Sequence, residues 1–159
     1  MEKELIVCRT SEQFSLAKKL TIDYMNWLGV DLYYQGIDKE HDTFHIMYNY
    51  PEGCFIYILI NDELAGGVGV RRLEDNICEM KRLYVYDKFK GDKLGLFLCN
   101  KLIEIAKELG YQKMRLDTLP TLKNALQLYS DLGFYKIPKY YNNPDERVVY
   151  LEIDFQNKA

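Results

Sequence analysis

The most constraining feature of this chain is a change in the spacing of its hydrophobic residues after residue 85. Between residues 94 and 109, leucine and isoleucine recur at steps of four, four, three and four, which is one face of an α-helix that ends at Gly110. On either side, residues 77–85 and 113–118 have the two-residue period of β-strands. A strand, a helix and a second strand in succession predict a right-handed βαβ crossover with parallel strands.

The remaining segments predict a mostly antiparallel sheet with further helices. Thr10 and Gln13 form a capping box that starts a helix, and Gly29 ends it. Turn residues at 61–62 and 74–76 divide an antiparallel meander into three strands, over residues 55–60, 66–71 and 77–85. The other expected elements are strands over residues 5–9, 134–137 and 148–155 and helices over residues 37–48 and 121–132.

These elements define an α+β fold. We predict a mixed, mostly antiparallel, twisted sheet of about seven strands, flanked by about four helices. A length of 159 residues suits one domain, so residues 1–159 are expected to form a single domain.

Charge and cysteine usage narrow the classes of partner and environment. Lys and Arg number 21 and Asp and Glu 24, a net charge of −3, so we expect neither nucleic acid nor a membrane as partner. The four cysteines lie more than 20 residues apart, which excludes C-x-x-C zinc pairs and indicates free thiols. Because no leader follows Met1 and no apolar stretch could cross a bilayer, we expect a reduced, cytoplasmic protein.

Two patterns are similar to known ligand sites but favour structural interpretations. His41 and His45 are spaced like zinc ligands on a metalloprotease helix, but Asp42 stands where that chemistry requires Glu, and no third ligand is evident. We therefore expect no metal. The Gly-Gly-Val-Gly run at residues 66–69 is similar to a dinucleotide-binding loop, yet no helix follows it. Glycines inside a strand indicate a bulge or a close approach of another group.

The segment from Tyr86 to Gly95 joins the expected strand at 77–85 to the next helix and is suited to bind phosphate. The first backbone N–H groups of a helix lack partners within the helix, and the helix dipole is positive there. Gly91 and Gly95 allow a close approach, and lysines at positions 88, 90 and 93 add positive charge. An ordinary solvated connection has a similar composition, so the loop alone does not decide between the two.

The strand before this loop carries side chains that a bound ligand would meet. Strict alternation gives it two faces, one with Glu79, Lys81, Leu83 and Val85 and the other with Cys78, Met80, Arg82 and Tyr84. A carboxylate and an ammonium on one face, upstream of a phosphate-binding loop, are placed to contact a substrate. The alternative is a Glu79–Lys81 ion pair on a solvated strand face.

Three segments within residues 77–155 resemble the GNAT superfamily of N-acetyltransferases. They are ICEMKRLYVYDKFKGDKLG, GYQKMRLDT and ALQLYSDLGF. The resemblance implies a GNAT-like fold and acetyl-CoA as cosubstrate. Members hold its pyrophosphate with an Arg-Gly-x-Gly-x-Gly loop, which matches Lys90, Gly91, Asp92, Lys93, Leu94 and Gly95. Lys93 replaces the middle glycine, and Leu122 stands where the family often has an Asn that contacts the cofactor.

The resemblance also implies roles in binding and catalysis. Backbone groups of Leu83, Tyr84 and Val85 are expected along the pantetheine arm of the cofactor. Glu79 is expected to face the acceptor amine and to accept its proton, and the Tyr129 hydroxyl to lie near the cofactor sulfur. The spacing of Tyr129 within its helix leaves a purely structural core position as the alternative.

We predict an enzyme that transfers an acetyl group from acetyl-CoA to a primary amine of a small molecule. Because the sequence suggests no histidine near a cysteine, direct attack in a ternary complex is expected rather than an acyl-enzyme. The candidate acceptor-binding residues are Tyr33, Tyr34, Lys81, Tyr140 and Tyr141; the late tyrosines alternatively pack a hairpin. Acetylation of a protein or peptide amine, a non-catalytic acyl-CoA-binding module, and a homodimer all stay open.

Overall fold

A computed structural model describes residues 2–29, 43–91, 93–143 and 145–156 of the chain. Its strands are β1 (Lys3–Val7), β2 (Cys54–Ile60), β3 (Glu63–Glu74), β4 (Ile77–Val85), β5 (Lys113–Thr118), β6 (Tyr135–Ile137) and β7 (Val149–Asp154). Its helices are α1 (Ser11–Leu28), α3 (Leu94–Glu108), α4 (Lys123–Leu132) and a short 3-10 turn, η1 (Asp87–Phe89). Residues 43–47 are also helical, within the predicted helix at 37–48, whose residues 37–42 lie outside the described part.

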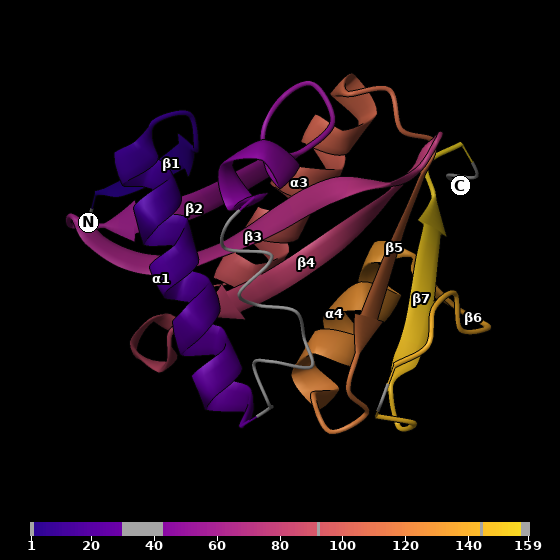
Figure 1. Ribbon diagram of the computed structural model, residues 1–159. Coiled ribbons are helices and arrows are strands. Elements are labelled where there is room, and N and C mark those ends of the chain that lie inside the picture. Colours follow the sequence, from indigo (N-terminus) through magenta and orange to yellow (C-terminus); the bar gives the residue numbers. More distant parts are fainter. Residues whose placement is uncertain (1, 30–42, 92, 144, 157–159) are drawn as a thin grey trace.

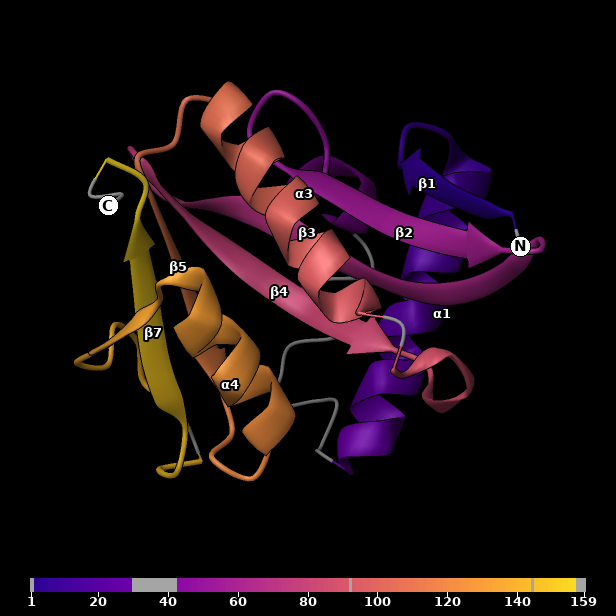
Figure 2. The ribbon, with the colours of Figure 1, turned by 180° about the vertical axis from the view of Figure 1, so that it is seen from behind.

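The strands form one seven-stranded sheet in the order β1-β2-β3-β4-β5-β7-β6. Every pair is antiparallel except β4 and β5, which are parallel and joined through α3, as the change of period predicted. Helix α1 lies on one face of the sheet (Figure 1), and α3 and α4 cover the other (Figure 2). The predicted α+β fold with a mixed, mostly antiparallel sheet is therefore confirmed.

Local sequence signals explain where the long helices begin and end. The Thr10 hydroxyl accepts a hydrogen bond from the backbone of Gln13, whose side chain accepts one from Thr10, so the predicted capping box starts α1. Gly29 ends this helix with a φ of 73°, a conformation that glycine adopts without strain. Helix α4 begins at Lys123, two residues later than predicted, and Gly133 caps it with a φ of 104°.

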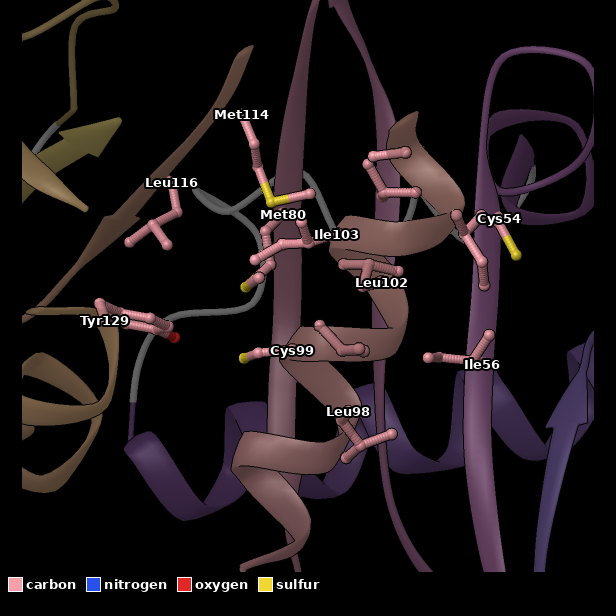
Figure 3. Packing of buried hydrophobic residues seen from close by; sticks show 14 of the residues in the cluster. Cys54, Ile56, Met80, Leu98, Cys99, Leu102, Ile103, Met114, Leu116 and Tyr129 are labelled. Atoms are coloured by element: carbon pink, nitrogen blue, oxygen red, sulfur yellow. The ribbon is translucent and has the colours of Figure 1, made fainter. Parts of the chain in front are cut away.

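The larger of two hydrophobic clusters fills the space between the sheet and α3 and α4. Figure 3 shows Leu98, Cys99 and Leu102 of α3 packed over the strands, with Tyr129 of α4 directed toward Cys99. The smaller cluster lies under α1 and includes Phe14, Leu20, Phe44, Tyr48 and Phe55. The four cysteines are buried, free thiols, in agreement with the sequence analysis.

A bulge in β4 contradicts the strict alternation predicted for this strand. Gly67 pairs with Tyr84 and Gly69 with Lys81, so two residues of β4 stand opposite Val68, and Arg82 has a φ of 64°. The extra residue reverses the faces beyond it. Leu83 and Val85 consequently pack in the same cluster as Cys78 and Met80, not on the side of Glu79 and Lys81. Placing all four residues Glu79, Lys81, Leu83 and Val85 on one face was wrong.

The glycines of residues 66–69 serve close packing inside β3, as the sequence indicated. A Cβ on Gly69 would lie 2.6 Å from the Phe55 ring and 2.8 Å from the Tyr48 ring. A Cβ on Gly67 would lie 2.8 Å from the carbonyl oxygen of Ile56. These contacts are shorter than real Cβ atoms tolerate, so α1-side aromatic rings and the neighbouring strand occupy the space that side chains would need.

Candidate active site

The parallel strands β4 and β5 part after Glu79 and Arg115, the last residues that pair between them. Both ribbon views show the two strands close together at one end and separated at the other (Figure 1, Figure 2). A cavity of about 70 Å³ opens beyond this point, and we call it the inner cavity. Its walls include Met80 to Leu83 from β4, Leu116 to Thr118 from β5, and Asn143, Asp145 and Val148 from the segment before β7.

A second, larger cleft of about 410 Å³ lies between β4 and the N-termini of α3 and α4; we call it the outer cleft. Tyr24, Leu83, Leu122 and Tyr129 line both spaces, so the outer cleft and the inner cavity meet at these four residues. The outer cleft is also lined by Tyr84, Val85, Lys90, Gly91, Lys93, Leu94 and Gly95. Most of the predicted cofactor loop and strand therefore borders one space; Asp92 lies outside the described residues.

Two helix N-termini face the outer cleft. Within the described chain, no side chain caps α3 or α4 at its N-terminus, and no acidic residue stands in the first turn of either helix. The first N–H groups of an uncapped helix remain available to an anion, and the dipole is positive there. The cleft therefore offers backbone donors and positive potential to a phosphate-bearing ligand.

The lysines of the loop have separate surroundings. Lys90 contacts Asp87 at 2.8 Å, and its ammonium lies 4.4 Å from the centre of the Trp27 ring. Lys93 precedes α3 with a φ of 58°, the left-handed conformation for which the family motif has glycine. Lys88 pairs with Glu63 at 2.7 Å and is not among the described residues that line the outer cleft. Lys90 and Lys93 are thus the loop cations placed to meet a ligand.

The carboxylate of Glu79 is almost completely enclosed. Only 1% of its side chain is exposed, and Oε1 lies 2.9 Å from Nε and 2.8 Å from Nη2 of Arg71 and 3.9 Å from Nζ of Lys81. Oε2 accepts a hydrogen bond of 2.6 Å from the Tyr140 hydroxyl. Burial acts to raise the pKa of Glu79, but the charges of Lys81 and Arg71 and these hydrogen bonds outweigh it and hold the pKa below its ordinary value.

Glu79 belongs to a row of alternating charges that crosses four strands. The strand registers place Arg71 opposite Glu79, Glu79 opposite Arg115, and Arg115 opposite Glu152. Nε of Arg115 donates to Oε1 of Glu152 at 2.9 Å, and the guanidinium lies 5.4 Å from the centre of the Tyr140 ring. Directly opposite charges stabilise a sheet pair, which explains how two carboxylates are tolerated in buried positions.

Tyr129 stands at the junction of the two spaces. Its side chain is 6% exposed and packs in the main cluster against Phe134, with the ring directed toward Cys99 (Figure 3). Burial, with smaller contributions from Cys99, Tyr24 and Asp117, raises the pKa of Tyr129 well above its ordinary value. The hydroxyl therefore stays protonated, a state suited to donate a proton or a hydrogen bond.

The predicted acceptor residues are only partly brought together. Lys81 lines the inner cavity, whereas Tyr140 and Tyr141 are not among its described walls and donate hydrogen bonds of 2.6 Å to Glu79 and Asp117, respectively. Tyr33 and Tyr34, like His41, lie outside the described residues. In the described chain, no group of three or more His, Cys, Asp or Glu side chains is arranged to hold a metal ion.

Sequence analysis missed three residues of the site. The helix pattern gave Tyr24 and Trp27 no role in a site, but Tyr24 lines both spaces and Trp27, which is 45% exposed, lines the outer cleft. Burial raises the pKa of Tyr24 to about 12. Asp117 lines the inner cavity from β5. The signal that could have indicated Asp117 is its place on the strand. It lies two residues after Arg115, which pairs with Glu79 of the parallel strand β4.

Comparisons with known proteins show the family to which the chain belongs. The sequence model of the acetyltransferase (GNAT) family matches residues 21–134. An uncharacterized N-acetyltransferase of Schizosaccharomyces pombe is 37% identical over 141 residues, which cover 86% of this chain and 85% of that protein. The chain belongs to the GNAT family. It is accordingly an acetyltransferase, as the resemblance implied.

Solved GNAT structures have the same fold. An acetyltransferase from Streptococcus agalactiae superposes with a TM-score of 0.78 at 20% identity, covering 96% of this chain and 98% of its own. The PaiA N-acetyltransferase of Thermoplasma acidophilum, solved with coenzyme A, superposes with a TM-score of 0.70 at 16% identity, covering 95% and 99%. None of the described helices of the present GNAT protein combines the length and apolarity that a membrane crossing requires.

Proposed function

We propose that this GNAT protein transfers the acetyl group of acetyl-CoA to a primary amine of a small molecule by direct attack. The observation that carries the proposal is the meeting of the outer cleft, with its two uncapped helix N-termini, and the inner cavity at Tyr129. Acetyl-CoA would supply the thioester whose acetyl group is transferred. The solved relative with coenzyme A supports this choice of ligand.

The residues of the outer cleft suit the pyrophosphate and the pantetheine arm. Gly91 has a φ of 98° and no heavy atom within 4 Å of the place of a Cβ, so the backbone of the loop is open to an approaching anion. Lys90 and Lys93 add positive charge beside the N-terminus of α3. Beyond Glu79, β4 no longer pairs with β5, which supports the backbone of Leu83 and Val85 as hydrogen-bonding partners of the arm.

Tyr129 would act as the proton donor to the departing sulfur. It lines both the cleft for the cosubstrate and the cavity for the acceptor, and its raised pKa keeps the hydroxyl protonated. A backbone N–H of Leu83, Tyr84 or Val85 would stabilise the oxyanion that develops when the amine attacks. Glu79, predicted to accept the proton of the amine, borders neither space among their described walls, so these walls offer no direct contact between its carboxylate and a bound amine.

The size of the inner cavity favours a small acceptor. The cavity measures about 70 Å³ within its described walls, well below the roughly 300–1,000 Å³ of a typical ligand pocket, which favours a short acceptor over a stretch of peptide. Lys81 and Asp117 place both signs of charge on these walls. An amino-acid-like compound, which carries both charges, therefore fits the lining better than an alkylamine without a carboxylate.

Two measurements test the proposal. Calorimetry with CoA should show binding, and release of free CoA from acetyl-CoA should occur with some of the amines in a panel of amino acids, polyamines, aminoglycosides and short peptides. Release with peptides alone would favour the protein or peptide acceptor. Binding without release would favour a module that holds acyl-CoA without transfer, and no binding at millimolar CoA would refute both the enzyme and the module.

A further inference from the structure

The position of Asp117 follows from the way in which β4 and β5 part. The parallel strands last pair at Glu79 and Arg115, and two residues further along each strand stand Lys81 and Asp117. Both of these residues line the inner cavity, one from each strand. Glu79 lies before the parting and is not among the described lining residues. The cavity therefore reaches Asp117 and not Glu79.

The hydrogen bonds of Glu79 and Asp117 also indicate that Asp117 is the carboxylate that a ligand can reach. Both oxygens of Glu79 are engaged, by Arg71 and by Tyr140. Asp117 accepts one hydrogen bond, at Oδ2, from the Tyr141 hydroxyl at 2.6 Å, while Asn143 donates to that hydroxyl at 2.9 Å. In the described part of the chain, Oδ1 of Asp117 accepts no hydrogen bond. One oxygen can thus receive an amine N–H while Tyr141 holds the other.

The charge of Asp117 also acts on the residues at the junction of the two spaces. It contributes to the raised pKa of both Tyr24 and Tyr129, although burial is the larger cause for each. All three residues line the inner cavity, so the carboxylate and the two rings border one space. Asp117 is accordingly near the place where the acceptor amine would meet the acetyl group.

We infer that Asp117 is a catalytic residue that accepts the proton of the acceptor ammonium, with Tyr141 as its positioning residue. The inference rests on the proposed acetyl transfer. At neutral pH a primary alkylamine is protonated and is no nucleophile until it loses one proton. Asp117 takes that proton and later releases it to water. The nitrogen lone pair then forms the N–C bond, the C–S bond breaks, and its electron pair leaves on sulfur. The second amine proton, delivered through Tyr129, completes the thiol of CoA.

The test compares carboxylate variants with any amine that the wild-type protein acetylates. Asp117→Asn keeps the size of the side chain and an acceptor for Tyr141, and it should lower kcat by a factor on the order of 10² to 10⁴. The affinity for CoA should stay near the wild-type value, read from the fluorescence of Trp27, the single tryptophan of the chain, in the outer cleft. Asp154→Asn on β7, a matched change outside both spaces, should keep the wild-type rate.

Two further variants make the result decisive. Tyr141→Phe leaves the carboxylate in place without its support and should lower kcat less than Asp117→Asn, with an unchanged KM for acetyl-CoA. Asp117→Glu moves the carboxylate by one methylene and should give an intermediate kcat; if Asp117→Asn loses the CoA response through misfolding, this variant decides.

Three outcomes would overturn the assignment. They are a wild-type kcat in Asp117→Asn, a wild-type kcat in Asp117→Glu, and a larger loss in Glu79→Gln than in Asp117→Asn with CoA binding intact. If the wild-type protein acetylates no amine of the panel, the proposed function fails and Asp117 loses its role with it. Acetylation by the wild type with an unimpaired Asp117→Asn variant refutes the role of Asp117 alone.

Discussion

The Glu79→Gln substitution tests whether the buried carboxylate stabilises the sheet. Glutamine has the same shape but no charge, so the Arg71 guanidinium, now 2.9 and 2.8 Å from a carboxylate oxygen, would donate to a neutral amide oxygen instead. Loss of one partner of a buried ion pair costs about 3–5 kcal/mol, and because glutamine keeps the hydrogen bonds of the carboxylate the variant should lose about 2–3 kcal/mol. Because 30% of the Arg71 side chain is exposed, water can recover part of its charge, which keeps the loss below that of a fully buried pair.

This loss should lower the Tm at pH 7 by about 5–10 °C for a chain of this length. The pKa of Glu79 is held below its ordinary 4.5, so its contribution is present above that pH and is lost as the pH falls through the lower folded value. The difference in unfolding free energy between the wild type and Glu79→Gln, measured by urea denaturation, should therefore become smaller below about pH 4.5. Glu63→Gln, whose pair with Lys88 is exposed, should cost less than about 1 kcal/mol. Equal stabilities of Glu79→Gln and wild type at pH 7, or a gap that persists in acid, would refute the reasoning.

Substitutions at three other positions test the cleft and its junction. Gly91→Glu should abolish CoA binding in calorimetry, whereas Gly91→Ala, with the same backbone strain at a φ of 98° and no added charge, should still bind. Tyr129→Phe should lower kcat by a factor on the order of 10² to 10³ with CoA affinity nearly unchanged; unaltered kinetics would return Tyr129 to a structural role. Lys93→Gly should raise the Tm relative to Lys93→Ala, because both lose the charge but only glycine relieves the φ of 58°. Equal melting temperatures of those two variants would show that the position is unstrained.

The sequence predicted the elements better than the contacts within the site. Periodicity identified the strand at 77–85, the helix at 94–109 and the parallel strand at 113–118, since these depend on local spacing. The bulge at Arg82 has no such signal, because Arg is an ordinary strand residue and its φ of 64° comes from the pairing with β3. Likewise, Glu79 is enclosed by Arg71 and Tyr140, which lie 8 and 61 positions away in the sequence, so local spacing does not show these contacts.

The bulge at Arg82 also explains how one strand can serve two ligands. Without it, alternation would turn Leu83 and Val85 to the face of Glu79 and Lys81, away from the cluster that contains Cys78 and Met80. The extra residue instead keeps Lys81 at the inner cavity while Leu83 and Val85 pack beside the N-termini of α3 and α4. The proposed cosubstrate and acceptor would then approach the same stretch of β4 from two sides and meet at Leu83. Removing one residue at 82 should therefore disrupt both binding functions, because every side chain beyond it would exchange faces.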